Sequence, residues 1–80
     1  MSSFEENELK IQEAKQAYLD AKNDWERQTA EGEIKYSIYC SYISKFGNND
    51  EETQLNAIKL ADKEMNEFVA EIKKIYGVFN

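Results

Sequence analysis

The side chains able to carry catalytic chemistry are few. The chain of 80 residues has one cysteine, Cys40, and no histidine. Without histidine it contains no Ser-His-Asp or Cys-His pair, and a single cysteine cannot build a zinc site. A reactive thiol needs a nearby cation or a helix N-terminus, and neither Lys35 nor Lys45 lies one helical turn from Cys40. We therefore predict that Cys40 is a buried structural thiol on an apolar helix face and that the chain is not an enzyme.

Carboxylates are the remaining candidates, because the chain has 16 Asp and Glu against 10 Lys and Arg. A two-metal site in a helical bundle typically uses Glu-x-x-His, which a chain without histidine lacks. A calcium loop alternates its oxygen ligands, whereas the acids of residues 50–52 are consecutive and are typical of the first turn of a helix. The sequence therefore predicts no metal and no cofactor.

The middle of the chain differs in charge from both ends. Residues 34–49 have two lysines and no acid, so their net charge is +2, against −5 for residues 1–33 and −3 for residues 50–80. Tyrosine is favoured at interfaces because it buries a large area and keeps a polar hydroxyl, and this segment has three. These rings either pack in the core or form a partner-binding surface. The candidate binding residues are Trp25, Lys35, Tyr36, Ile38, Tyr39 and Tyr42, of which Ile38 and Tyr42 are expected to be the most exposed.

The elements that position these residues are predicted to be helices, because the chain has no proline and only three glycines. Ser3 and Glu6 have the spacing of a capping box, which predicts a helix start. From Phe4 to Phe46 a large side chain then recurs every seven residues, except at Gly32. A stripe of this length is typical of helices packed on helices. Its members are Phe4, Ile11, Tyr18, Trp25, Gly32, Tyr39 and Phe46.

A second set of signals separates the last helix from the rest of the chain. Lys45 and Gly47 are typical of a helix end. Asn49 and Glu52 have the spacing of a new cap. We expect a turn at residues 47–50 and a helix over about residues 50–76.

Two architectures are compatible with the residues before this turn. In an antiparallel helical hairpin, one helix over residues 3–46 would be about 65 Å long, whereas the last helix reaches about 40 Å. Part of the apolar stripe of the first helix would then be exposed to water unless a second chain covered it. The self-association residues in that case are Phe4, Ile11, Tyr18 and Trp25, with Trp25 as the central one.

In the other architecture the chain breaks near Gly32. This gives helices over about residues 3–31 and 33–46 and a small three-helix bundle. A glycine inside a helix costs about 1 kcal/mol relative to alanine, which permits a break without requiring one.

Residues 34–43 also alternate apolar and polar side chains, which is typical of a strand. Helical spacing explains the same segment better, because it gathers apolar side chains on one face and needs no strand partner. That face carries Tyr36, Tyr39, Cys40, Ile43 and Phe46. We therefore predict an all-α fold, with residues 1–80 forming a single helical domain.

The predicted function is binding to another protein. No apolar run approaches the ~20 residues of a membrane span, and the net charge of −6 disfavours direct binding to nucleic acid or anionic lipid. A free thiol without a targeting segment suggests a cytoplasmic location. By analogy with small phage and mobile-element proteins, we expect an inhibitor or modulator of a larger assembly. The alternative is a structural coiled-coil homodimer, and a third option is a small-ligand binder or nucleic-acid mimic.

Overall fold

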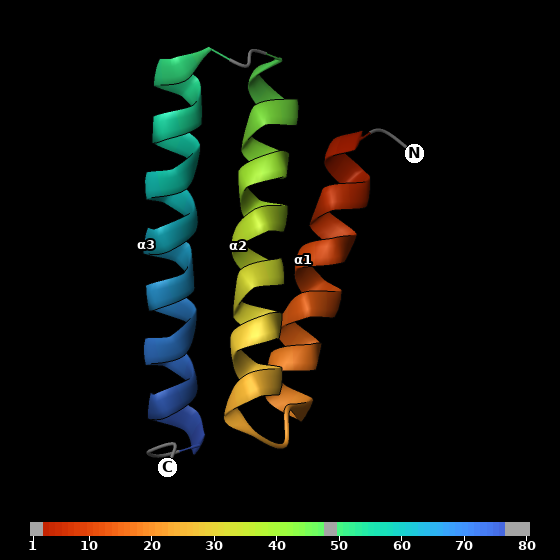
Figure 1. Cartoon of the computed structure of the whole chain (residues 1–80), viewed down its shortest axis with the longest axis vertical. Helices are drawn as coiled ribbons and strands as arrows, with labels where there is room; N and C mark the ends of the chain where they lie inside the picture. Colours follow the sequence, from red (N-terminus) through yellow and green to blue (C-terminus); the bar gives the residue numbers. More distant parts are fainter. Residues whose placement is uncertain (1–2, 48–49, 77–80) are drawn as a thin grey trace.

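Three α-helices make up the described part of the chain (Figure 1). The computed structural model describes residues 3–47 and 50–76, with side chains described for residues 5–47 and 50–75. Helix α1 spans Ser3–Asp20, α2 spans Asp24–Phe46 and α3 spans Glu51–Tyr76. The all-α prediction and the three-helix alternative are confirmed, and residues 34–43 are helical. The hairpin with one helix over residues 3–46 is wrong.

Helix α2 lies between its two neighbours and packs along both (Figure 1). Helices α1 and α3 meet only through longer side chains. The Tyr18 ring of α1 lies edge-on to the Phe68 ring of α3, with ring centroids 5.6 Å apart, and Lys15 Nζ lies 5.3 Å from the Phe68 centroid. The bundle is therefore open, with α2 as the central helix.

The first turn lies at residues 21–23 and not near Gly32, so the predicted position of the break is wrong. Asn23 caps α2, because its backbone is extended and its side-chain oxygen accepts a hydrogen bond from the Glu26 backbone N–H at 2.9 Å. The Glu26 carboxylate accepts in return from the Lys22 backbone N–H at 3.2 Å and from the Asn23 amide at 3.2 Å. This reciprocal cap satisfies backbone donors that a helix start leaves unpaired. Gly32 lies within α2.

The second turn follows the prediction for residues 47–50. Gly47 has φ 61° and ψ 23°, a left-handed conformation that glycine adopts without steric cost, and its N–H donates to the Ile43 carbonyl at 2.9 Å. Asp50 starts α3, since its carboxylate accepts from the Thr53 backbone N–H at 2.8 Å. Asn49 of the predicted Asn49 and Glu52 pair lies outside the described residues, as does the side chain of Ser3.

The core lies where all three helices meet, and Ile34 of α2 is fully buried at its centre. Two buried serines, Ser37 and Ser41, let α1 approach α2 closely, and the Ser41 hydroxyl donates to the Glu8 carboxylate at 2.9 Å. The buried apolar cluster consists of Ile11, Ala14, Tyr18, Ala30, Ile34, Ile38, Ala61, Met65 and Ile72.

The burial of Ile34 predicts a matched difference between two isoleucines. Ile34→Val removes one methylene from a site that is 0% exposed and should lower the free energy of unfolding by about 1 kcal/mol. Ile58→Val makes the same change at a helical site that is 49% exposed and should lower it by clearly less. Urea unfolding followed by helical circular dichroism measures both, and equal losses would contradict this description of the core.

Candidate protein-binding surface

The side of α2 that faces away from the core carries most of the exposed aromatic side chains of the described residues. Trp25 is 73% exposed, Tyr36 is 68% exposed and Phe46 is 57% exposed. Tyr39 and Ile43 are half-buried, and Thr29 and Gly32 are exposed. We call this surface the outer face of α2; it consists of Trp25, Thr29, Gly32, Tyr36, Tyr39, Ile43 and Phe46.

Helix geometry explains why this face points outward. Successive residues turn by about 100°, so residues nine positions apart lie on opposite sides of a helix. Trp25 and Ile43 are each nine positions from Ile34, the buried centre of the core. Small and aliphatic side chains of α2 face its neighbours, and the large rings are left on the solvent side. The alternative that the three tyrosine rings form the core is therefore wrong for Tyr36.

Gly32 lies in the middle of the outer face, and its own fold gives no reason for a glycine there. Its φ is not positive, since Gly47 is the glycine with positive φ among the described residues. A Cβ added to Gly32 would meet no atom within 4 Å. A glycine inside a helix costs about 1 kcal/mol relative to alanine. Gly32 therefore leaves the middle of the outer face without a side chain, although the fold of this chain has room for one.

The charge of Lys35, at the edge of the outer face, is already engaged. Its Nζ lies 3.5 Å from a carboxylate oxygen of Glu31 in α2 and 3.5 Å from one of Asp62 in α3. Both pairs are partly exposed, so each contributes little to stability. They do hold the Lys35 side chain over the α2–α3 boundary, where its aliphatic stem borders the rings.

Tyr36 and Cys40 interact across one turn of α2. The Tyr36 hydroxyl donates a hydrogen bond to the Cys40 sulfur, and this bond, together with the nearby negative charge when the thiol ionises, raises the pKa of Tyr36 above its ordinary value of 10.0. Cys40 is half-buried rather than buried, so the prediction of a buried thiol is wrong. The reason is its position on α2, between the outer face and the side covered by α1.

The apolar surface continues from α2 onto α3. A hollow of about 230 Å³ lies between Tyr36 and Tyr39 on one side and Ile58 on the other. Ile58 is half-exposed, and Leu55, one turn before it in α3, is also exposed. The exposed apolar area is therefore wider than a single helix stripe.

The structure brings four of the six predicted binding residues together. Trp25, Tyr36 and Tyr39 lie on the outer face of α2 and Lys35 lies at its edge. Ile38 is only 4% exposed, so the expectation that it is exposed is wrong, because it points between α1 and α3 into the core. Tyr42 is half-buried on the α3 side of α2, and its ring lies against that of Phe46 at the edge of the outer face, with ring centroids 4.6 Å apart.

The predicted self-association stripe is divided by the turn at residues 21–23. Ile11 and Tyr18 are buried against the other helices of the same chain, so a second chain is not needed to cover them. The side chain of Phe4 lies outside the described residues. Trp25 alone of these four is described as exposed.

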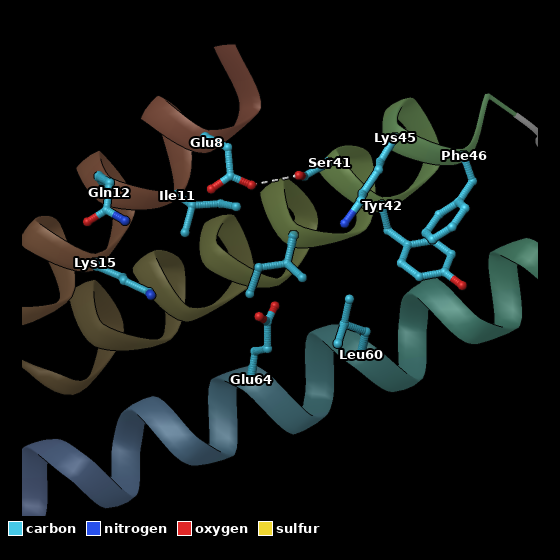
Figure 2. Close-up of a pocket in the computed structure, with 11 residues that line it drawn as sticks. Glu8, Ile11, Gln12, Lys15, Ser41, Tyr42, Lys45, Phe46, Leu60 and Glu64 are labelled. Atoms are coloured by element: carbon cyan, nitrogen blue, oxygen red, sulfur yellow. Dashed lines mark hydrogen bonds between the residues drawn. The ribbon is translucent and has the colours of Figure 1, made fainter. Parts of the chain in front are cut away.

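A second concave feature is a groove of about 310 Å³ between α1 and α3, with α2 as its floor (Figure 2). Charged side chains of both signs border it. Glu8 is bound to Ser41, and Lys15 contacts the Phe68 ring, so two of these charges already have partners within the chain. The groove is lined by Glu8, Ile11, Gln12, Lys15, Ile38, Ser41, Tyr42, Lys45, Phe46, Leu60 and Glu64.

Among residues 3–47 and 50–76, no cluster of three or more His, Cys, Asp or Glu side chains has the arrangement of a metal site. Over the same residues, none of the helices has the length and apolar character that crossing a membrane requires.

Comparison of the chain with protein-family models, with curated proteins and with solved structures gives no significant match.

Four residues of the outer face were not among the predicted binding residues: Thr29, Gly32, Ile43 and Phe46. The signal for two of them was the seven-residue register, because Gly32 and Phe46 belong to the predicted stripe together with Trp25 and Tyr39. The intermediate positions 29, 36 and 43 complete the alternating spacing of four and three residues that one helix face requires.

The contact between Tyr36 and Cys40 predicts a change in titration. Cys40→Ala should lower the pKa of Tyr36, because it removes the acceptor that favours the protonated phenol; NMR titration of the Tyr36 ring signals measures this. Since the folded-state pKa is raised above 10.0, the contribution to stability is present below that pH and is lost as pH rises through the folded-state pKa. An equal Tyr36 pKa in both proteins would contradict the contact.

Proposed function

We propose that this chain is a non-enzymatic protein that acts by binding another polypeptide through the outer face of α2. The observation that carries the proposal is the exposure of two large aromatic rings, Trp25 and Tyr36, on one face of α2, with a third, Phe46, at the edge of that face toward α3. Large aromatic side chains exposed along one helix face commonly mark an interaction site.

The chemistry of these side chains supports a binding role. Aromatic residues bury a large area with few rotatable bonds, and tryptophan and tyrosine dominate the residues that contribute most to protein interfaces. Trp25 and Tyr36 are such residues, and both are held on a regular helix rather than on a loop. Less conformational entropy is then lost on binding.

A helix face of this type fits an apolar groove of a partner. By filling such a groove on a larger protein, the chain would exclude whatever else the groove binds. This is the physical route by which a protein of 80 residues would inhibit or modulate a larger assembly.

Photo-crosslinking in the native cell tests the proposal. A photoreactive phenylalanine analogue placed at Tyr36 should give discrete crosslinked polypeptides. Adding Trp25→Ala should lower their yield at least about tenfold, because truncating a large, exposed tryptophan of an interface weakens binding by that much or more.

The matched control carries the analogue at Ile75, which is 66% exposed on α3 and so equally accessible to solvent. It should not give the same products. Identical products from positions 36 and 75, or a yield unaffected by Trp25→Ala, would refute the proposed surface.

A further inference from the structure

We infer that the outer face of α2 pairs with the same face of a second copy of this chain, with the two α2 helices antiparallel. The inference rests on the proposed function, because it uses the same surface, and it specifies the bound polypeptide.

The spacing of the outer face is that of a helix-pairing seam. Its seven positions run from Trp25 to Phe46 in alternating steps of four and three residues, which covers three heptads. In most small bundles such a seam faces the core of the same chain. Here it faces solvent, because the turn at residues 21–23 directs α1 to the opposite side of α2.

The available area is that of a small interface. A large aromatic side chain buries about 150–250 Å² when fully covered, so Tyr36 and Phe46, which are 68% and 57% exposed, offer on the order of 200–300 Å² per copy. Tyr39 and Ile43 add to this, and two copies together supply roughly 600 Å² or more, which is the range of a weak, reversible dimer. Trp25 lies beyond the paired residues in the register described below and is not counted.

One antiparallel register fits the shapes of the face. When Tyr36 of one copy lies opposite Tyr39 of the other, Thr29 lies opposite Phe46 and Gly32 lies opposite Ile43. Gly32, where an added Cβ would meet no atom of its own chain within 4 Å, then receives a branched side chain from the second copy. In a parallel pair Gly32 would face Gly32 and leave a void, which packed interfaces avoid.

The same register also fits the charges. The residues that flank the seam pair diagonally across it and not directly opposite one another. On one side Lys35 lies next to Tyr42 of the second copy, and on the other side Glu33 lies next to Cys40, so no like charges meet. Sliding the helices by one heptad, so that residue 36 faces residue 32, would place Lys35 against Lys35 and Glu33 against Glu33. Residues 34–49, which supply the C-terminal part of this surface, contain no acid, and this lowers the repulsion there between two chains of negative net charge.

Sedimentation equilibrium tests the pairing. We expect the wild-type chain to approach twice its monomer mass as its concentration rises through the micromolar range. Tyr36→Glu should raise the dissociation constant at least about thirty-fold, because it places a charge at the centre of the seam. Ile75→Glu adds the same charge at a site of nearly equal exposure, 66% against 68%, and should leave the dimer intact.

A wild-type chain that stays monomeric, or an equal effect of the two variants, would overturn the inference. Circular dichroism should show the same helix content for both variants, since both sites are exposed and helical.

The single native cysteine tests the orientation. In the antiparallel register Glu33→Cys faces Cys40 of the second copy, so mild oxidation should give a disulfide-linked dimer. The pair cannot close within one helix, because seven residues span about 10.5 Å, beyond the reach of a disulfide. Lys35→Cys faces Cys40 only in the parallel arrangement and should link poorly. Preferential linking by Lys35→Cys would overturn the antiparallel pairing.

The two proposals fail separately. A monomeric chain that still crosslinks to a different polypeptide from position 36 retains the proposed function and loses the second copy as its partner. A monomeric chain without specific crosslinks loses both.

Discussion

The reversal of the chain at residues 21–23 is the constraint on which the rest of the structure depends. It is held by the reciprocal hydrogen bonds of Asn23 and Glu26, and it returns α1 along α2 in the opposite direction. Ile11 and Tyr18 thereby become buried within the chain. Without the reversal, these side chains would extend beyond α3 and remain in water, and the apolar area lost would outweigh the small gain of an uninterrupted helix.

The reversal also decides which face of α2 remains free. Both neighbouring helices pack on the side of α2 that contains Ile34, and on the α1 side this surface is built from small residues such as Ala30 and Ser37 that allow close approach. An aromatic ring there would separate the helices. The large rings therefore lie on the opposite side, and one helix presents an aliphatic face to its own chain and an aromatic face to solvent. A helix so divided is suited to join its own bundle to another polypeptide.

The features of the fold that depend on residues close together in the sequence were predicted correctly. Gly47 after Lys45 marked the end of α2, and the helical spacing of residues 34–43 outweighed their strand-like composition. The first turn was misplaced because glycine was taken as the breaker, whereas Asn23 and Glu26 have the same cap spacing as Ser3 and Glu6. The inward face of α2 was misassigned for a different reason. Which side is buried depends on where α1 and α3 lie, and a periodic stripe alone does not contain that information.

A distance between α1 and α2 tests the reversal most directly. The Asn7 amide donates to the Ser44 hydroxyl at 3.3 Å. Spin labels at positions 7 and 44, in a Cys40→Ser background and diluted with unlabelled chain, report this separation by pulsed electron spin resonance. The folded-back structure predicts a single short distance. A continuous helix would separate the two positions by about 55 Å, and a distance near that value would contradict the reversal and the outward orientation of the aromatic face.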